Sequence, residues 1–520
     1  MKLIFVSHIK IRILDFTHPL QTVAQICTLT WNIADAQQPG NPSIIRDNTT
    51  CVHTCIERLL SESTYLTALS LITMRAKQIT AAVFAATHAV NGSPSPSTSS
   101  SPHDLALRML KSIEERGQAT LDAGGSTGFI QLGLFWQALA VVLPSPETPD
   151  ANSKANENDT AAALRPLLES SLVSTIPAFA NVTKDVELPL DRFSLGADMI
   201  AWTLGAAETG GDSNATTTFL QTIQNLNDSL ALQPRNANGG LWYYNNVNNL
   251  TAYSNLSYLD GMYSYAPFVT ILPQLNNSAT DPAAALEASV TQLQILHDIC
   301  VKPSGLLVHG YDAIKSHAWA ANSSEGASPD VWGRSLAWYS LGLLNTLEIA
   351  AQSPEQSRSE AYASLRTLFR SVMQAQVQAA ERSKLQTDVP GVWQVVDARG
   401  EVGNFVEASS SLVTVYTLLR GERLDFLGDL DSADAVAGEA GQNCTSSSIV
   451  NLATEIYESV SKQYLVTYAN GSLSLNGTSS VASLSPQNVG YEYYVSRPVA
   501  FDSLIGTSAF ALASYEMGML

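Results

Sequence analysis

The stretch Ser257-Tyr-Leu-Asp-Gly-Met-Tyr-Ser-Tyr-Ala-Pro-Phe268 places one carboxylate, that of Asp260, among aromatic side chains and directly before a glycine. Removing a carboxylate from water costs free energy, so an aspartate in apolar surroundings usually has a partner or a chemical task. Such surroundings also raise the pKa of a carboxyl group, as a general acid working near neutral pH requires. A helix cap beside a core helix is the alternative interpretation of the same motif.

Outward from this stretch, apolar residues recur with helical spacing and predict helices. The expected helices cover residues 129–143, 198–208, 262–275, 283–301, 332–351, 359–381, 408–419, 449–463 and 504–518. Alternating Val and Ile runs are scarce, so the sequence predicts an all-α fold. The helices come in pairs whose spacing is too irregular for a short-repeat solenoid, which favours a helical toroid.

The long loops between these helices carry Trp, Tyr, His and Asp. Loops on a rigid scaffold commonly hold the functional residues, and aromatic rings stack on the C–H-rich faces of pyranose sugars. We therefore expect a sugar site at one end of the toroid. An all-α scaffold that only binds partners is the alternative from another functional class.

The composition restricts the partners. The chain has 520 residues, of which 45% are hydrophobic and 14% charged, and its net charge is −19. This acidic balance argues against nucleic acid or an anionic membrane as partner. An anionic substrate would need a local cationic pocket against the overall field.

Potential N-glycosylation sites are dense in this Lys-poor chain, which favours a secreted, extracellular glycoprotein carrying N-glycans. The Asn-x-Ser/Thr asparagines are Asn48, Asn91, Asn158, Asn181, Asn214, Asn227, Asn249, Asn255, Asn276, Asn322, Asn443, Asn470 and Asn476.

The N-terminal part is read by its composition. Residues 1–37 are interpreted as a degenerate leader or a mis-assigned start, because the apolar run is interrupted by charged residues. Residues 38–104 are expected to be an extension that ends in a Ser/Pro-rich linker, and residues 105–520 the catalytic domain. No apolar run has the length and purity expected of a transmembrane helix.

Five cysteines suit an oxidising compartment if Cys27 leaves with a leader, since an even four then remain. His53 lies between two of them, but no second pair completes a metal site, so a structural role is favoured over zinc. The cysteines are Cys27, Cys51, Cys55, Cys300 and Cys444.

Four further segments combine aromatic residues with residues that can take part in catalysis or binding. Gly239-Gly-Leu-Trp-Tyr-Tyr244 lies upstream of Asp260, and Gly305-Leu-Leu-Val-His-Gly-Tyr-Asp312 lies downstream. In residues 328–339, Pro329 and Asp330 are expected in the first helical turn, and the arginine that follows lies between two tryptophans, a suitable seat for a carboxylate. Near the C-terminus, Tyr491-Glu-Tyr-Tyr-Val-Ser-Arg-Pro498 precedes an apolar helix. No phosphate-binding loop, Ser-His-Asp elbow or metal-ligand cluster is found, so no cofactor and no metal are expected.

Taken together, these motifs resemble the unsaturated rhamnogalacturonyl hydrolases of glycoside hydrolase family 105, which are related to the unsaturated glucuronyl hydrolases of family 88. The resemblance covers roughly residues 105–520 and rests on motifs in a fixed order. They are LDGMYSYAPF (259–268), LLVHGYD (306–312), SPDVWGRSLAWY (328–339), VWQVVD (392–397), EASSSLVTVYTLLRG (407–421) and EYYVSRPVAFDSLIGTSAFALA (492–513).

The resemblance implies an (α/α)6 barrel and a particular reaction. The substrate would be a pectic oligosaccharide that carries a Δ4,5-unsaturated galacturonosyl residue at its non-reducing end. An acid would protonate C4 of the C4=C5 bond, water would add at C5, and the hemiketal would open and release the sugar. One well-placed carboxylic acid can serve both steps.

The family's catalytic aspartate corresponds to Asp260, and a second aspartate of the related enzymes corresponds more loosely to Asp191, for which an ordinary helix N-cap is the alternative. The residues expected to contact or shape the sugar site are His309, Arg334, Trp332, Trp338, Trp242, Tyr243 and Tyr311.

Two positions depart from the family pattern, which often has histidine at Tyr243 and methionine at Ser264. Both lie near the expected sugar site and could alter the preferred length or linkage of the substrate. The alternatives are a related hydrolase of unsaturated glucuronides and a catalytically inactive carbohydrate-binding barrel. The presence of Asp260 counts against the inactive barrel, whereas nothing in the sequence ranks the sugars.

Overall fold

A computed structural model describes residues 2–7, 10–15, 100–143, 155–208, 214–245, 251–275, 280–428, 430–431, 443–444 and 446–520. The chain divides into two units, Met1–Ser97 and Thr98–Leu520. In the first unit, strands β1 (Lys2–Ser7) and β2 (Lys10–Asp15) pair antiparallel. The second unit carries the helices and all the expected site residues.

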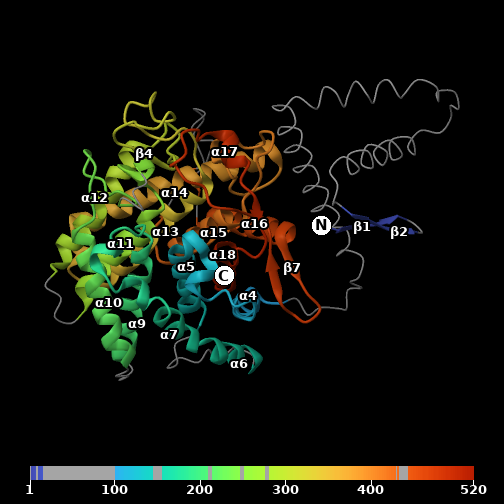
Figure 1. Ribbon diagram of the computed structural model, residues 1–520, viewed down its shortest axis with the longest axis horizontal. Helices are drawn as coiled ribbons and strands as arrows, with labels where there is room; N and C mark the ends of the chain where they lie inside the picture. Colours follow the sequence, from blue (N-terminus) through green and yellow to red (C-terminus); the bar gives the residue numbers. More distant parts are fainter. Residues whose placement is uncertain are drawn as a thin grey trace. The chain divides into compact units, whose positions relative to one another are not determined.

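Six helices of the second unit form a closed inner ring, in which each helix packs against the next inner helix along the chain and the last packs against the first. This ring agrees with the predicted all-α (α/α)6 barrel (Figure 1). The inner helices are α5 (Gly128–Val142), α9 (Arg192–Glu208), α11 (Gly261–Ile271), α13 (Gly333–Gln352), α15 (Ala408–Arg423) and α18 (Leu504–Gly518).

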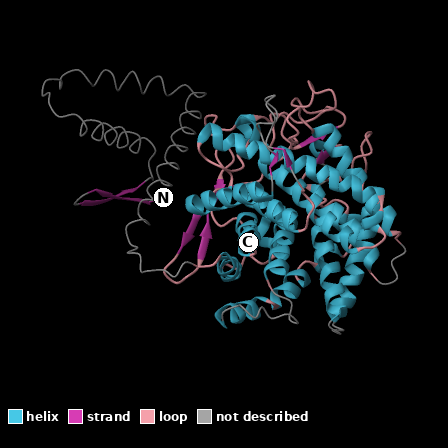
Figure 2. Cartoon of the chain, turned by 180° about the vertical axis from the view of Figure 1, so that it is seen from behind, coloured by secondary structure: helices cyan, strands magenta, loops and turns pink. Residues whose placement is uncertain are grey.

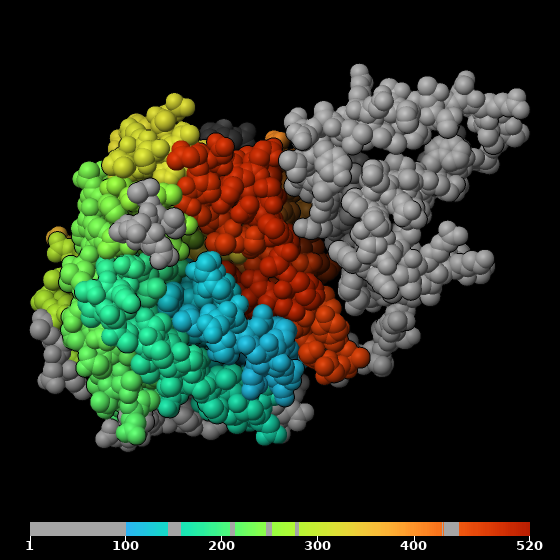
Figure 3. Space-filling model, viewed as in Figure 1, coloured from blue at the N-terminus to red at the C-terminus, as the bar shows by residue number. Residues whose placement is uncertain are grey.

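A second set of helices alternates with the inner ones along the chain, and each packs on the outside of a ring helix. Helix α4 packs on α18, so the start of the unit closes the ring against its end. Figure 3 shows this closure, since the residues just after 100 lie between the C-terminal residues and the part that follows α5. The outer helices are α4 (Pro102–Glu115), α7 (Pro166–Val173), α10 (Asn214–Ala231), α12 (Pro282–Cys300), α14 (Glu360–Thr387) and α16 (Ser446–Tyr464).

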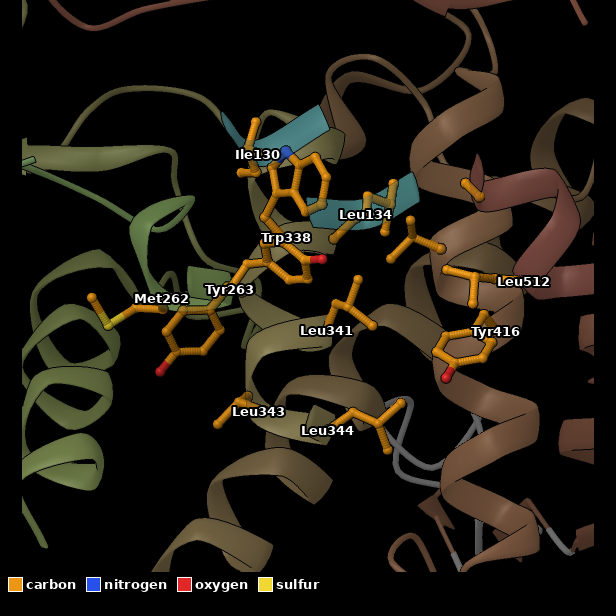
Figure 4. Packing of buried hydrophobic residues seen from close by; sticks show 14 of the residues in the cluster. Ile130, Leu134, Met262, Tyr263, Trp338, Leu341, Leu343, Leu344, Tyr416 and Leu512 are labelled. Carbon is orange, nitrogen blue, oxygen red and sulfur yellow. The ribbon is translucent and has the colours of Figure 1, made fainter. Parts of the chain in front are cut away.

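The inner helices are buried on nearly all sides, which explains why they read as almost continuously apolar or small. Their buried hydroxyls return to the carbonyl one turn earlier, as the Thr346 hydroxyl does to the Gly342 carbonyl at 2.7 Å. A Cβ atom at Gly342 would lie 2.5 Å from the carbonyl oxygen of Met262, so glycine allows α13 to approach α11 closely. Figure 4 shows the apolar packing between the ring helices, with Trp338 and Tyr263 among aliphatic side chains.

In the second unit the strands are short and lie in the loops between helices (Figure 2). Strand β3 (Leu256–Tyr258) pairs antiparallel with β4 (Gly310–Asp312). This pairing places the segment that leads into Asp260 beside the segment that carries His309. The remaining short elements are α6 (Ala155–Leu164), α8 (Val182–Asp185), α17 (Tyr491–Val495), β5 (Leu430–Asp431), β6 (Asn443–Cys444), β7 (Leu465–Thr467), β8 (Leu473–Leu475), β9 (Thr478–Ser479) and β10 (Val499–Ala500).

The helices predicted near residues 129–143, 283–301, 408–419, 449–463 and 504–518 are confirmed, with ends that differ by up to four residues. The first turn predicted at Pro329 and Asp330 is wrong. Backbone of Val331 and Gly333 instead pairs with the extended segment 394–396, and α13 begins only at Gly333. Helix α9 begins six residues earlier than predicted, because small residues in its first turns hide the apolar period. Helices α4, α7 and α10 were not predicted.

The N-terminal segment, the domain boundary and the cysteines can be compared with the structure in part. Residues 16–99, which hold the rest of the predicted leader and most of the extension and linker with Cys27, Cys51 and Cys55, lie outside the described residues. The proposed boundary at 104–105 falls inside α4. Cys300 is a free, buried thiol, so it does not take part in the expected set of disulfides.

One stretch of the described residues, Leu121–Val142, is long and apolar enough to cross a membrane, which the sequence reading did not expect. It contains the inner helix α5, whose apolar surface packs against α9 and α18. Burial inside the ring therefore accounts for this composition.

Candidate active site

Residues at the N-terminal ends of several inner helices contact one another at one end of the ring. Asp260 immediately precedes α11, Ser335 lies in the first turn of α13, and Asp191 immediately precedes α9. Glu407 is the N-cap residue of α15. Because a helix N-terminus carries partial positive charge, an end where several N-termini meet is suited to anionic groups.

The carboxylate of Asp260 is nearly buried and is held by groups from other elements. The Ser335 hydroxyl donates to Oδ2 of Asp260 at 2.5 Å and also lies 3.2 Å from the His309 carbonyl oxygen. Nε2 of His309 lies 3.5 Å from the same Oδ2. Asp260 stands at the N-cap position of α11, but its side chain accepts no capping hydrogen bond. The helix-cap interpretation is therefore wrong, and the carboxylate is directed to its neighbours on other segments.

Asp191 forms the second carboxyl group of the site. Its Oδ1 accepts a hydrogen bond from the Tyr243 hydroxyl at 2.7 Å, and the residue is almost completely buried. The pKa of Asp191 is raised to about 7, chiefly by burial and also by the nearby Asp260 charge, while the Tyr243 hydrogen bond and Arg192 oppose the rise. The N-cap interpretation of Asp191 does not explain this contact, because Oδ1 accepts a hydrogen bond from Tyr243 on another segment.

Glycine after Asp260 explains how the two carboxyl groups come together. A Cβ atom at Gly261 would lie 2.9 Å from Cδ1 of Leu190 and 3.3 Å from Cδ2 of Tyr243. The start of α11 therefore packs directly on the segment that carries Asp191. Only glycine fits at position 261 without a clash, so the Asp-Gly motif seen in the sequence has a steric cause.

His309 lies fully buried at the centre of an aromatic group. Its Nδ1 is 3.0 Å from the Tyr494 hydroxyl, while its Nε2, which faces Asp260, has no hydrogen-bond partner. Its ring lies 4.7 Å from Trp332 and 5.2 Å from Tyr258, measured between ring centroids. The predicted proximity of His309 to the Asp260 motif is present in the structure.

Arg334 differs from its expected role as an open seat for a carboxylate. Its Nη2 donates to the carbonyl oxygens of Ser479 at 2.6 Å and Ser480 at 2.9 Å, and the guanidinium lies 4.9 Å from the Trp332 ring. Its Nη1 lies 4.0 Å from Oε1 of Glu407. Burial lowers the pKa of Arg334. The guanidinium is thus occupied by partners within the chain.

Glu407 is a site residue that the sequence reading did not single out. Its carboxylate is fully buried and accepts from the backbone N–H groups of Ser410 at 2.7 Å and Ser479 at 2.9 Å, and from the hydroxyls of Ser409 and Ser410. The signal that could have indicated it is the sequence Glu-Ala-Ser-Ser-Ser, since an acidic N-cap followed by serines suits a helix start. Glu407 joins Arg334 to the segment around Ser479.

The remaining predicted aromatic residues divide into two groups. Trp332 donates from Nε1 to Gln394 and contacts His309, so it borders the site. Trp338 lies one turn deeper in α13 and packs on Tyr263 at 4.8 Å between ring centroids, inside the ring (Figure 4). Trp338 is enclosed by core side chains, and its contact with a sugar stays a prediction.

Tyr311 is fully buried, and its hydroxyl lies 2.9 Å from Nδ2 of Asn236, so its contact with a sugar stays a prediction. Trp242 is partly exposed, and its Nε1 has no hydrogen-bond partner. Of the predicted aromatic residues, Tyr243 is the one whose polar atom reaches a carboxyl group of the site. Within the described part of the chain, no group of three or more His, Cys, Asp or Glu side chains is arranged to hold a metal ion.

Comparison with known proteins places this site in context. Residues 212–438 match the family model described as Glycosyl Hydrolase Family 88. Protein Atu3128 of Agrobacterium fabrum is 27% identical over 241 residues, which are 45% of this chain and 91% of that protein. The 24.9 kDa protein in the picA locus of Rhizobium radiobacter matches with the same identity and coverage.

Solved structures share the fold. A glycoside hydrolase of family 105 from C. acetobutylicum aligns with a TM-score of 0.59 and 22% identity, over 80% of this chain and 99% of that one. A possible family 105 member from Salmonella enterica aligns with a TM-score of 0.55 and 14% identity, over 82% and 96% of the two chains. The chain is thus similar to family 88 over residues 212–438, and its fold is that of the family 105 structures.

The region matched by the family model contains Asp260, His309, Arg334 and Glu407. Asp191 lies before that region, so its place in the site rests on the structure, through Tyr243 and the contact of Leu190 with Gly261.

Proposed function

We propose that this protein is a glycoside hydrolase that hydrates the C4=C5 bond of a Δ4,5-unsaturated galacturonosyl residue at the non-reducing end of lyase-degraded rhamnogalacturonan. The observation that carries the proposal is the arrangement around Asp260. This carboxylate makes no cap to its own helix, receives the Ser335 hydroxyl, faces Nε2 of His309 and lies beside the second carboxyl of Asp191. Similarity to the hydrolases of family 88 supports this class of substrate.

The chemistry needs one carboxylic acid that gives a proton and takes another back. Asp260 in its acid form protonates C4, and the positive charge that develops is shared by C5 and the ring oxygen. Water attacks C5 and gives up its proton to the Asp260 carboxylate, so the acid is restored. The C5 hemiketal opens, the anomeric carbon becomes an aldehyde, and the aglycone leaves with the glycosidic oxygen. Overall, one water molecule is consumed.

The other groups hold this carboxyl and its substrate. Ser335 fixes Oδ2 of Asp260 in position. Nε2 of His309 is the buried, unpartnered nitrogen that faces Asp260, and it is placed to contact a sugar hydroxyl or the uronate. Arg334, held by Ser479 and Ser480, adds a buried positive charge at the same end of the ring. Such preorganised groups stabilise charge that develops during the reaction.

The enzyme is further proposed to be a secreted glycoprotein. A glycan needs an accessible asparagine, and the sequon asparagines whose side chains the structure describes are exposed or half-buried. They are Asn158, Asn181, Asn214, Asn227, Asn255, Asn322, Asn470 and Asn476. Digestion of protein secreted by a eukaryotic host with an N-glycosidase should lower its apparent mass, and an unchanged mass would contradict glycan attachment.

Turnover of the unsaturated substrate tests the main proposal. Oligosaccharides made by a rhamnogalacturonan lyase absorb ultraviolet light through the conjugated C4=C5 bond, and the enzyme should remove this absorbance. Asp260→Asn should lower the rate by about a hundredfold to ten-thousandfold with the fold intact. The exposed Asp425, whose side chain is 91% accessible, provides the matched control Asp425→Asn, which should keep the wild-type rate. A near wild-type rate in Asp260→Asn would remove Asp260 from this role.

A further inference from the structure

Tyr243 has a defined chemical partner in this chain that the reaction as described does not use. Its hydroxyl is 2.7 Å from Oδ1 of Asp191. Burial raises the pKa of the Tyr243 phenol well above 10, and the Asp191 charge raises it further, so the phenol keeps its proton. A phenol that stays neutral has one proton to donate. The contact is therefore a hydrogen bond from Tyr243 to Asp191 whenever Asp191 is ionised.

The packing around Tyr243 fixes this hydroxyl. Its backbone N–H donates to the Leu256 carbonyl at 2.8 Å, and its carbonyl accepts from the N–H of Leu190 at 3.0 Å. Its ring lies 4.5 Å from the Tyr258 ring and 4.9 Å from the Tyr244 ring, between centroids. Tyr243 is thus bound directly to the segment that carries Asp191, and its phenol has little freedom to turn away.

We propose that Tyr243 is a positioning residue for Asp191: its hydroxyl holds Oδ1 of this buried carboxyl group and favours its ionised form. This inference rests on the proposed function and adds a residue to it. With Oδ1 occupied by the phenol, Oδ2 is the oxygen through which Asp191 gains or loses its proton.

The groups that face Asp191 come from several elements. Tyr243 donates to it, Asp260 repels its negative charge, and Arg192 attracts it. Tyr244 and Tyr263 are near enough for the Asp191 charge to raise their pKa values, and both remain neutral phenols. Tyrosine at position 243 therefore supplies a hydrogen bond without positive charge. A histidine at the same position would add positive charge in acid and lower the pKa of Asp191.

The pH dependence of kcat/KM distinguishes this role from simple packing. Tyr243→Phe keeps the ring but removes the hydroxyl, so the pKa of Asp191 rises and the limb of the pH profile that follows ionisation of Asp191 should move up by about one pH unit or more. The maximum of kcat/KM should fall about tenfold, mainly through kcat. Tyr243→His should move the same limb down and restore most of the maximum. Limbs of Tyr243→Phe that coincide with those of wild type would overturn the proposal.

A second readout needs no turnover. The infrared band of the protonated Asp191 carboxyl can be identified as the band that disappears in Asp191→Asn, and its titration can be followed in wild type and in Tyr243→Phe. The midpoint should lie higher in Tyr243→Phe, and equal midpoints would overturn the proposed role of Tyr243. An enzyme without activity on unsaturated oligosaccharides but with the expected shift would contradict the proposed function and leave the Tyr243–Asp191 coupling established.

Discussion

Replacing Asp191 by asparagine should make the protein more stable at neutral pH while it removes activity. The pKa of Asp191 rises from its usual 3.8 to about 7 in the folded protein, because burial disfavours the charged form. In the unfolded chain the carboxyl ionises near its usual value. Between these two values the unfolded state releases its proton first, so the stability of the wild type falls as the pH rises and levels off above the folded pKa.

One pKa unit corresponds to about 1.4 kcal/mol, so this change amounts to about 4 kcal/mol once both states are ionised. Asparagine has no proton to release and still offers Oδ1 to the Tyr243 hydroxyl. The difference in unfolding free energy between Asp191→Asn and wild type should therefore grow by about 4 kcal/mol from pH 4 to pH 8, in favour of the variant. Part of that gain comes from relief of the repulsion with Asp260, which acts in the same direction.

Urea unfolding followed by tryptophan fluorescence at several pH values measures this difference. Asp425→Asn is the control for the change from carboxylate to amide, because the Asp425 side chain is almost fully exposed. A pH-independent difference for Asp191→Asn would refute the reasoning, since it would mean that the carboxyl ionises equally in the folded and unfolded states.

Four further substitutions test the construction of the site and of the ring. Ser335→Ala removes the hydroxyl that donates to Asp260, and kcat should fall about tenfold; an unchanged kcat would show that this contact is dispensable. Arg334→Ala leaves buried carbonyls without a donor and should cost about 3–5 kcal/mol in urea unfolding, whereas a cost below 1 kcal/mol would speak against its anchoring role. Gly342→Ala should lower the unfolding free energy by about 1–3 kcal/mol, because its Cβ would meet the backbone of α11. Gly205→Ala, on another inner helix with open space around its Cβ, should instead stabilise by about 0.5–1 kcal/mol, and equal effects of the two would contradict the close approach.

The sequence predicts what lies close together along the chain. Helical periodicity indicates most of the ring helices, because an inner helix must bury most of its surface and reads as apolar. The motif around Asp260 and the glycine-flanked His309 are recognised for the same reason, since each is a local pattern.

What the sequence does not reveal are the partners of these residues. The hydroxyl on His309 comes from Tyr494, 185 positions away, and the hydroxyl on Asp260 comes from Ser335, 75 positions away. The sequence predicts that Arg334 is free to bind a carboxylate, but its carbonyl partners lie about 145 positions further along, around Ser479. Closure of the ring determines these contacts, and no local period records it.

The measurement that tests the central claim most directly follows the reaction on a lyase-made unsaturated oligosaccharide in D2O by NMR at early times. Hydration initiated by Asp260 predicts one deuterium at C4 of the released uronate, loss of the C4=C5 signal at the same rate, and neither change with Asp260→Asn. Release of a sugar that keeps its C4=C5 bond and carries no deuterium at C4 would contradict the account, because the bond would then have been cleaved at the anomeric carbon.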